Sequence, residues 1–510
     1  MLAFESVTWN AGLPAAVAIA AGWFSWYAWK FFFSPLLYRD EPRELPYLIP
    51  FVGHTLSMVT GAHRMFSNGR KRFGNKPWAV TIMGESLYVI SSAEDVQAVY
   101  RAPKTLDFDP FIKEMLSKYG ITADTASRMF DTLPGHKKNW METSIENFKL
   151  QLHRGAKLDI VQKKLLGFID DLLVWDRLRG RMVLQDGEEE RVVSLYSWSE
   201  MVIVDAQTRA FFDEVLYEKC PDLLAQFQIY EDESWKVPMD LPDFSTKALR
   251  SSKSSIEKGL RQYLQLPQHK RPNESWIVTT LCEDMDRLGL EETQKVHVLF
   301  SFYRVMNANA YKLVFWIISH LLFEPKLMKE IADEVEPAFR GEKHSAPDLD
   351  HLLNSCPLLE STCEEVLRLT NWPIGTRTVQ ADTVIGGKKL RQGRKLLMPY
   401  RAMHFDSTVF GADAAAFNPR RFLEDKNLVA NKSYRPFGGA AHYCPGRYIA
   451  RTEVQMYTAV MLKRFDMSVT ESDSKGQKPT FPKMDNTLPS GGIQVPLKGE
   501  DLIVRVRPSK

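Results

Sequence analysis

Apolar residues are most concentrated near the N-terminus of the chain. Residues 11–33 contain no charged side chain before Lys30, so this stretch is long enough to cross a bilayer core of about 30 Å. A cleaved signal peptide would have a shorter apolar core behind a basic segment, and no basic segment precedes this one. The pattern predicts a retained transmembrane helix over residues 1–33. Three tryptophans would lie at the membrane surface, namely Trp23, Trp26 and Trp29.

Charged residues on the two sides of this anchor predict its orientation. Glu5 precedes the apolar stretch, whereas Lys30, Arg39 and Arg43 end or follow it. Positive residues stay on the cytosolic side of a membrane. We therefore expect a single-pass protein of the endoplasmic reticulum membrane, with the rest of the chain in the cytosol.

Prolines separate the anchor from the rest of the chain. Pro42, Pro46 and Pro50 recur at every fourth position, and a proline biases both itself and its predecessor away from helix. The pattern predicts a stiff linker over residues 34–60, followed by one large domain over residues 61–510.

The large domain combines long stretches of helical periodicity with a few runs of strand periodicity. Residues 78–91 alternate around Gly84 and predict two strands, whereas residues 356–370 repeat apolar positions at helical spacing. The predicted fold class is therefore mainly α with a smaller β region. The other predicted elements are a helix over 93–102, mostly helix over 142–321, short strands over 376–400, a long helix from Pro445 and a small C-terminal sheet over 493–508.

Composition, charge and motif content argue against several classes of protein. The chain has 66 basic and 63 acidic residues and a formal net charge of +3, which gives no reason to expect nucleic acid as a partner. Its 5 cysteines are odd in number, and their spacing matches neither a disulfide framework nor a zinc site. No glycine-rich loop stands between a strand and a helix, so no nicotinamide or flavin domain is predicted.

One cysteine, Cys444, is surrounded by residues with special backbone properties. Gly438 and Gly439 precede it, and Pro445 and Gly446 follow it. Proline suits the first turn of a helix, and a helix N-terminus stabilises a thiolate. A single cysteine ligand suits haem iron better than zinc. A merely structural cysteine would leave the glycines unexplained.

This loop resembles the haem-binding loop of the cytochromes P-450, which reads Phe-x-x-Gly-x-(Arg/His)-x-Cys-x-Gly. Ala440 departs from the pattern, because the family has its first glycine there. The resemblance implies a cytochrome P-450 fold behind the transmembrane helix, with haem b held through the thiolate of Cys444. It also implies haem contacts from four residues of the loop: Phe437, Gly438, His442 and Gly446.

Further motifs of the same family lie elsewhere in the chain. Glu365 and Arg368 resemble the Glu-x-x-Arg pair of a structural helix, and Arg421 is placed to join them. By resemblance, Arg377 pairs with a haem carboxylate, as does His442. The family's Trp-x-x-x-Arg haem contact is not evident, and the candidates for its role are Lys149, His153 and Arg154.

The helix predicted over residues 299–322 departs from the family at the positions that serve dioxygen. Family members have a kink there with an acid and an alcohol that deliver protons, whereas this chain has Asn309 and Ala310. An asparagine amide donates hydrogen bonds but supplies no proton at neutral pH. The run from Asn309 to Trp316 resembles the branch of sterol 7α- and 12α-hydroxylases and prostacyclin synthase. The loop around Cys444 also suits fungal members of secondary metabolism.

The resemblance implies a membrane-anchored, fungal-type monooxygenase that inserts one atom of dioxygen into a small lipophilic substrate, such as a terpenoid, a steroid or a related polycycle. Its partners would be NADPH-cytochrome P-450 reductase and the lipid bilayer, and basic residues such as Arg447 and Arg451 could face the reductase. Asn309 and Ala310 leave two alternatives open. One is a reductase-independent isomerase or dehydratase, and the other is a non-catalytic haem sensor.

Overall fold

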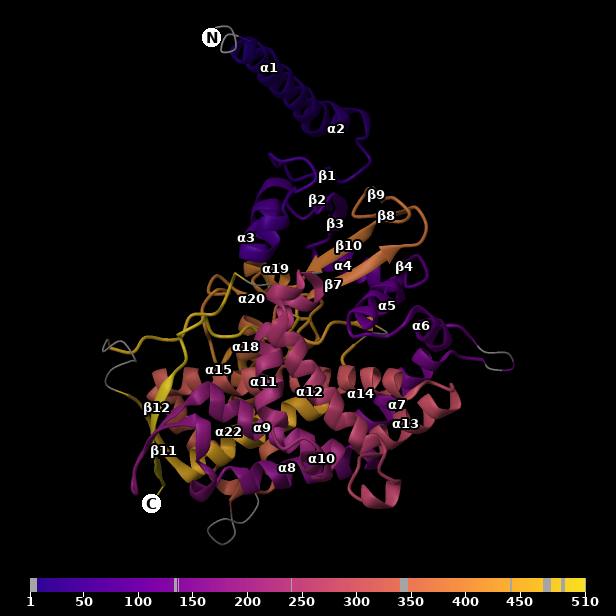
Figure 1. Cartoon of the computed structure of the whole chain (residues 1–510). Coiled ribbons are helices and arrows are strands. Elements are labelled where there is room, and N and C mark those ends of the chain that lie inside the picture. Colours follow the sequence, from indigo (N-terminus) through magenta and orange to yellow (C-terminus); the bar gives the residue numbers. More distant parts are fainter. Residues whose placement is uncertain are drawn as a thin grey trace, which may run out of the picture. The chain divides into compact units, whose positions relative to one another are not determined.

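The computed structural model describes residues 7–132, 135, 137–239, 241–339, 347–440, 443–470, 478–487 and 491–509. The chain divides into two compact units, each assembled from segments that are far apart in the sequence (Figure 1). The first unit comprises Met1–Pro110, Ile374–Met403 and Thr487–Pro489, and the second comprises Phe111–Pro373, His404–Asn486 and Ser490–Lys510.

The first unit is built on a six-stranded sheet with the strand order β1-β2-β3-β10-β7-β4. Strands β2 and β3 pair antiparallel around Gly84, whose φ of +80° suits glycine in a tight turn. This hairpin and the short strands after Thr376 confirm the strands predicted there. The strands are β1 (Arg43–Glu44), β2 (Trp78–Ile82), β3 (Glu85–Val89), β4 (Leu106–Asp107), β7 (Ile374–Val379) and β10 (Lys395–Pro399), with β8 (Thr383–Ile385) and β9 (Lys388–Leu390) as a separate pair.

The helices of the first unit lie mostly before its sheet in the sequence. They are α1 (Val7–Ala28), the π-helix η1 (Trp29–Phe33), α2 (Ser34–Leu37), α3 (Thr55–Phe73) and α4 (Ala93–Arg101). Ser92 caps α4 by accepting a hydrogen bond from the backbone N–H of Asp95 at 3.1 Å. The chain crosses between the units within α5 (Asp109–Lys118) and α19 (Arg401–His404).

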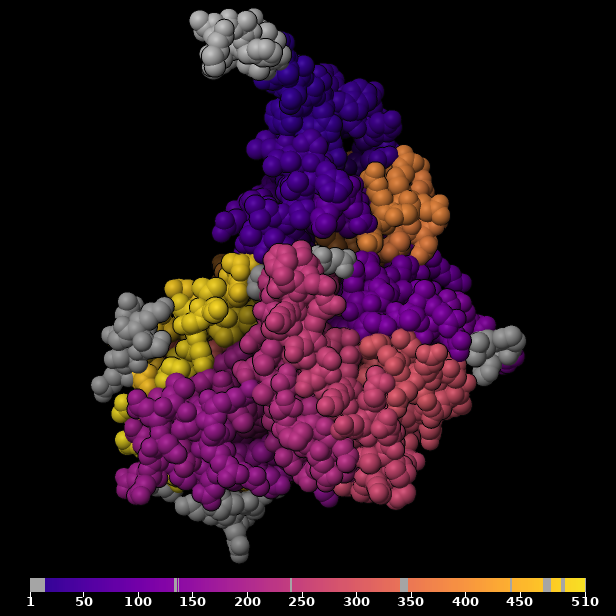
Figure 2. All heavy atoms as spheres, in the orientation of Figure 1, coloured from indigo at the N-terminus to yellow at the C-terminus, as the bar shows by residue number. Residues whose placement is uncertain are grey.

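The N-terminal helices are attached to the segment that follows them. Lys30 Nζ donates to the hydroxyl of Tyr47 at 2.7 Å and lies 3.1 Å from the carboxylate of Glu44, and Trp23 Nε1 donates to Leu48 O at 2.7 Å. Within the described residues, no helix combines the length and the apolar character needed to cross a bilayer. Figure 2 shows the heavy atoms of the protein, with this segment in indigo. Large apolar side chains of the segment are nevertheless exposed, namely Val17, Ile19, Phe24, Trp29, Phe32, Phe33, Leu36 and Leu37.

The second unit is mainly helical. A four-stranded sheet with the order β11-β12-β6-β5 completes it, so the mainly α fold class with a smaller β region is confirmed. The helices are α6 (Ala123–Phe130), α7 (Trp140–Leu152), α8 (Ala156–Leu172), α9 (Leu195–Phe212), α10 (Val215–Lys219), α11 (Leu223–Glu233), α12 (Lys247–Leu264), α13 (Trp276–Arg287), α14 (Glu292–Asn307), α15 (Ala310–Phe323), α16 (Pro325–Val335), α17 (Leu349–Asn354), α18 (Pro357–Thr370), α20 (Ser407–Phe410), α21 (Arg421–Glu424) and α22 (Arg447–Arg464), and the strands are β5 (Val183–Asp186), β6 (Arg191–Ser194), β11 (Phe465–Val469) and β12 (Ile503–Pro508).

The core of this unit surrounds α9, α15 and α22, which contact one another and carry fully buried large side chains such as Trp198, Trp316 and Tyr457. Helix α18 forms where the periodicity predicts it, but only Pro357 and Glu360 in its first turn are exposed, and its other polar residues are buried with the apolar ones. The helix predicted from Pro445 begins two residues later, because Pro445 and Gly446 form a turn ahead of α22.

Candidate functional site

The loop that contains Cys444 folds back on itself. The backbone N–H of Cys444 donates to Phe437 O at 3.0 Å, and the N–H of Tyr443 donates to Ala440 O at 3.2 Å. Gly438 has a φ of +78° and donates to Arg435 O at 3.2 Å, a conformation that favours glycine. The residues before and after the turn are therefore held together as one rigid backbone unit. His442, also predicted to contact haem, lies outside the described residues.

Ala440 adopts the left-handed conformation for which the family uses glycine. Its φ is +55°, and a side chain in this region costs about 1 kcal/mol or more. The substitution therefore preserves the turn geometry at a cost in local strain.

The surroundings of Cys444 act in opposite directions on its thiol. Burial raises the pKa of Cys444, whereas the N–H of Gly446 and the charges of Arg447 and Arg451 lower it, and burial outweighs them. A bound metal cation would favour the thiolate further. The donor set, one thiol and a backbone N–H directed at its sulfur, fits a single cysteine ligand to haem iron.

Two arginines behind this loop have partners within the second unit. Arg447 Nη1 donates to Cys444 O at 3.0 Å and to His153 Nε2 at 3.1 Å. Arg451 pairs with Glu364, with Nη2 3.0 Å from Oε2, and its side chain is 25% exposed. The charge of Arg451 is therefore largely compensated by Glu364 rather than displayed to a partner.

The structure brings Glu365, Arg368 and Arg421 into one buried network. Both oxygens of Glu365 accept hydrogen bonds from Arg368 at 2.8 Å and from Arg421 at 3.2 Å. Arg368 also donates to the carbonyl oxygens of His404 and Ala414 at 2.7 Å each. The Glu365 and Arg368 side chains are 0% exposed. The network joins α18 to the segment that leads into the cysteine loop.

Arg377 lies on β7 of the first unit and is buried. Its Nη1 donates to Thr376 O at 2.6 Å, and its guanidinium packs against the rings of Tyr100 and Phe108. Burial lowers the pKa of Arg377, although the nearby side chains of Tyr100, Tyr400 and Asp107 raise it. No carboxylate forms an ion pair with it among the described residues. A buried guanidinium without an acidic partner can accept an anionic group.

Helix α7 has two buried polar groups with no partner in the described structure, Trp140 Nε1 and Ser144 Oγ. They lie one turn apart on the same face, on a helix that contacts α22. Two adjacent unsatisfied donors fit the carboxylate of a haem better than they fit an empty core. Their spacing is that of the family's Trp-x-x-x-Arg contact with serine replacing arginine, and this replacement is why the sequence pattern missed Trp140.

The long helix of the second unit is broken where the family pattern expects a kink. Asn309 lies between α14 and α15 with φ −129° and ψ −40°, outside the helical region. Asn307 Nδ2 donates to Tyr303 O at 3.0 Å, whereas its buried Oδ1 has no hydrogen-bond partner in the described part of the chain. Ala310 is buried and begins α15. The break therefore presents amide groups and a methyl group in place of an acid and a hydroxyl.

A short C-terminal segment, residues 492–494, is attached to α15 and α18. Asn309 Oδ1 accepts from the N–H of Ile493 at 3.0 Å, and Trp316 Nε1 donates to Gln494 O at 2.7 Å. The N–H of Gln494 donates to Thr370 O at 2.9 Å. A Cβ at Gly492 would lie 2.1 Å from Asn309 Oδ1, so a larger residue there would displace the Asn309 side chain. The Asn309 side chain is thus held by the segment that faces it.

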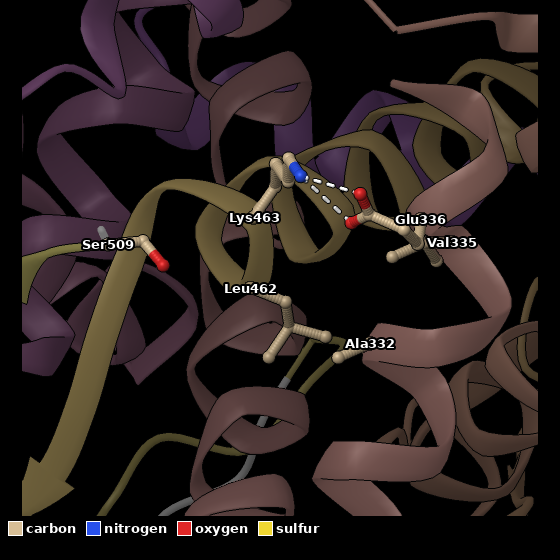
Figure 3. Close-up of a pocket in the computed structure, with 6 residues that line it drawn as sticks. All are labelled: Ala332, Val335, Glu336, Leu462, Lys463 and Ser509. Carbon is tan, nitrogen blue, oxygen red and sulfur yellow. Dashed lines mark hydrogen bonds and ion pairs between the residues drawn. The ribbon is translucent and has the colours of Figure 1, made fainter. Parts of the chain in front are cut away.

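A surface pocket of the second unit lies apart from all of these residues. It is lined by Ala332, Val335, Glu336, Leu462, Lys463 and Ser509 (Figure 3). The Lys463 ammonium binds both oxygens of Glu336 at 2.7 and 2.9 Å, so the polar groups at its rim are mutually paired. This pocket contains none of the predicted site residues.

Comparisons with known proteins match most of the chain. A family model described as Cytochrome P450 matches residues 313–497. Cytochrome P450 monooxygenase poxD of Penicillium oxalicum is 25% identical over 454 residues, which cover 86% of this chain and 89% of that protein. Cytochrome P450 7A1 of Sus scrofa is 27% identical over 248 residues, which cover 44% of this chain and 48% of that protein.

A solved structure described as retinoic acid bound cyanobacterial CYP120A1 has a similar fold. It aligns with a TM-score of 0.70 at 17% sequence identity, and the alignment covers 92% of this chain and 100% of that chain. The match between folds therefore extends well beyond the residues of the family model.

Proposed function

Because the chain belongs to the cytochrome P450 family and is an enzyme of the monooxygenase kind, we propose that it inserts one atom of dioxygen into a lipophilic substrate. The observation that carries this proposal is the geometry of the Cys444 loop, with the N–H of Gly446 directed at the Cys444 sulfur. A haem bound through this thiolate would activate dioxygen with electrons received one at a time.

The residues of the chain would hold haem b in distinct ways. Cys444 would ligate the iron, and the turn around Gly438 would let the backbone lie against the flat ring. Trp140 and Ser144 would donate hydrogen bonds to one haem carboxylate, because their donors are buried and unsatisfied. Arg377 would bind a carboxylate by charge, as the resemblance to the family implies.

The proposed substrate is a terpenoid, a steroid or a related polycycle of secondary metabolism. One matched relative supports the steroid part of this class, a protein named cholesterol 7-alpha-monooxygenase that is 28% identical over 228 residues. Asn309 Nδ2 is a donor that could bind a substrate oxygen while Oδ1 stays bonded to Ile493. Titrating the purified enzyme with sterols and terpenoids, and recording the haem spin-state shift, tests this substrate class.

The proposed electron donor is NADPH-cytochrome P-450 reductase. The test is reconstitution of the purified enzyme with reductase, NADPH and a panel of polycyclic compounds. Product that requires both NADPH and reductase supports the proposal.

The pair Asn309 and Ala310 favours one second candidate, a reductase-independent isomerase or dehydratase, because such a reaction needs no proton delivery to dioxygen. Turnover without reductase would support that candidate. Haem binding without any turnover would instead support a non-catalytic haem sensor.

We also propose that the N-terminal segment holds the enzyme at the endoplasmic reticulum membrane, with the catalytic domain on the cytosolic side. Its exposed apolar side chains support binding to lipid. Flotation with lipid vesicles tests the proposal. The full chain should float with the vesicles, whereas a chain lacking residues 1–29, which retains Lys30 and its contacts, should stay in the soluble fraction.

A further inference from the structure

A group of charged side chains is buried beside the helix break, and the proposed reaction leaves it without a role. Lys312 lies on α15, three residues after Asn309, and its backbone N–H donates to Asn309 O at 3.1 Å. The Lys312 side chain is 8% exposed. Around it are Glu200 on α9, Glu231 and Asp232 on α11, and Arg181 on the 3-10 turn Gly180–Met182.

One carboxylate ties the two halves of the broken helix together. Lys312 Nζ on α15 donates to Glu231 Oε1 at 2.7 Å, and Arg304 Nε on α14 lies 3.4 Å from Glu231 Oε2. Burial raises the pKa of Glu231, but Lys312 and Arg304 outweigh burial and lower the pKa below its usual value. Glu231 is therefore a charged, structural member of the cluster.

Glu200 differs from Glu231, the other glutamate of this charged cluster. Its side chain is 3% exposed, and its Oε2 has no hydrogen-bond partner within the described residues. Arg181 Nη2 lies 3.5 Å from Oε2, too far for a strong charge-assisted hydrogen bond. Burial, together with Asp232 and Glu231, raises the pKa of Glu200 to about 8, although Arg181 and Lys312 lower it. At neutral pH this carboxyl therefore holds a proton.

Two tyrosines lie near this carboxyl, Tyr196 on α9 and Tyr311 on α15, and the charge of Glu200 acts on both. Tyr196 precedes Glu200 by one turn of α9, and its hydroxyl lies 3.5 Å from the hydroxyl of Tyr311. Tyr311 directly follows Ala310, and its side chain is buried. A tyrosine hydroxyl both donates and accepts a hydrogen bond, but 3.5 Å exceeds the usual length of a hydrogen bond between two hydroxyls. A proton would therefore pass between them through a bridging water molecule or after a small approach of the two rings.

We propose that the Glu200 carboxyl is the proton donor that serves the break between α14 and α15, in place of the acid that is missing at Asn309. The inference rests on the proposed monooxygenase function. That reaction consumes dioxygen, two electrons and two protons, and it places one oxygen atom in the substrate and one in water. The electrons come from NADPH through the reductase. Glu200 loses its proton toward the break, becomes a carboxylate and is reprotonated from solvent beside Arg181, whose side chain is 32% exposed.

The pH response of Glu200 depends on every group that faces it. These groups are Tyr196 on its own helix, Arg181 on the 3-10 turn, Glu231 and Asp232 on α11, Tyr303 on α14, and Tyr311 and Lys312 on α15. Because Glu200 loses its proton as pH rises through about 8, proton supply should fall over the same range.

The chain offers a matched control in a second buried carboxyl. Glu453 on α22 also has a pKa raised by burial to about 8, and it accepts hydrogen bonds from Gln207 Nε2 at 2.9 and 3.1 Å. The groups around it do not include the tyrosines or the lysine of the break. Glu200→Gln and Glu453→Gln therefore remove equally buried protons, of which only the first is placed to serve the break.

Infrared spectroscopy of the purified haem-loaded enzyme tests the proton on Glu200 without turnover. At pH 7, protonated Glu200 and Glu453 should each contribute a component to the carbonyl stretch of the wild type, and Glu200→Gln and Glu453→Gln should each lose a different component. A spectrum that Glu200→Gln leaves unchanged overturns the proposal, because Glu200 would then carry no proton to donate.

The second measurement is the hydrogen peroxide released per NADPH consumed, with reductase and cholesterol as the probe. We expect Glu200→Gln and Tyr196→Phe to raise this ratio at least threefold at pH 7, and Glu453→Gln to leave it within about 1.5-fold of the wild type. The wild-type ratio should rise above pH 8, whereas that of Glu200→Gln should stay flat. Equal ratios in the two glutamine variants overturn the proposal. A wild type that consumes no NADPH refutes the monooxygenase function itself, and the inference with it.

Discussion

The Glu365 network and the helix break belong to the same unit of the protein, yet their polar groups are treated in opposite ways. The Glu365 carboxylate accepts hydrogen bonds from Arg368, Arg421 and the backbone N–H of Asn418. Near the break, Asn307 Oδ1 and Glu200 Oε2 are buried and have no hydrogen-bond partner among the residues that the structure describes. An unsatisfied buried polar group costs about 1–3 kcal/mol. The first region is built for rigidity, whereas the second retains polar groups that a ligand, a water molecule or a proton can use.

The two regions also differ in how closely they follow the family pattern. The cysteine loop keeps the family's chemistry even at Ala440, because the backbone there still adopts the left-handed conformation. The break keeps the family's geometry but replaces its side chains with Asn309 and Ala310. Shape is therefore preserved in both places, and the chemistry is altered only at the break.

The largest effect is expected at Cys444, in the loop that follows the family motif. Cys444→Ser should abolish the thiolate-type absorbance band of the reduced carbon monoxide complex, because serine cannot supply a thiolate to the iron. Cys282→Ser, which changes a cysteine outside the loop, should keep the band. Retention of the band in Cys444→Ser would refute the ligand assignment.

The next effect tests whether the Glu365 network is rigid. Arg368→Met should lower the free energy of unfolding by about 3–5 kcal/mol, because it leaves Glu365 as a buried charge without its main partner. Arg420→Met removes the exposed pair with Glu330 and should cost less than about 1 kcal/mol. Chemical denaturation monitored by haem absorbance measures both values. Equal losses in the two variants would show that burial of the network contributes nothing.

A smaller effect is expected at the break. Ala310→Thr restores the hydroxyl of the family pattern and should change the hydrogen peroxide released per NADPH about fivefold, the effect of roughly 1 kcal/mol on competing steps. Ala310→Val has the same shape without the hydroxyl and separates its chemistry from its size. If threonine and valine give the same ratio, then residue 310 lies outside the proton path.

The smallest effect is expected at Ala440, where the chain departs from the family pattern but keeps the backbone conformation of a glycine. Ala440→Gly should stabilise the enzyme by about 0.5–1 kcal/mol, because glycine adopts a positive φ without strain. Ala415→Gly, at an exposed alanine without a positive φ, should be neutral or slightly destabilising. The midpoint of thermal inactivation compares the two. A lower midpoint for Ala440→Gly would mean that the alanine methyl group contributes contacts that outweigh its strain.

The sequence predicted those elements whose pattern is local. The hairpin around Gly84, helix α18 and the loop around Cys444 each depend on neighbouring residues, so periodicity and motif were sufficient. The start of the last helix was misplaced because Pro445 fits both a first helical turn and the turn that the structure shows. The buried donor of Trp140 was missed, since the family motif was sought with an arginine where the chain has Ser144.

The sequence pattern could not predict contacts between side chains that lie far apart in the chain. Nothing near Glu200 in the sequence indicates that it faces Lys312, more than a hundred positions away, or that Tyr196 meets Tyr311. These contacts arise from the packing of α9 against α15, which the sequence does not encode as a motif. The residues that set the proposed proton supply could therefore be found only from the structure.

The attachment of residues 492–494 to α15 has a consequence for how this enzyme can diversify. The partners of the segment, Asn309 and Trp316, lie almost two hundred positions before it, so two distant parts of the sequence form one hydrogen-bonded unit. Recombination with a relative at a single crossover between them separates matched halves, and Gly492 then faces a foreign side chain. Only exchange of both halves together preserves the hydrogen bonds of Asn309 and Trp316 to the segment.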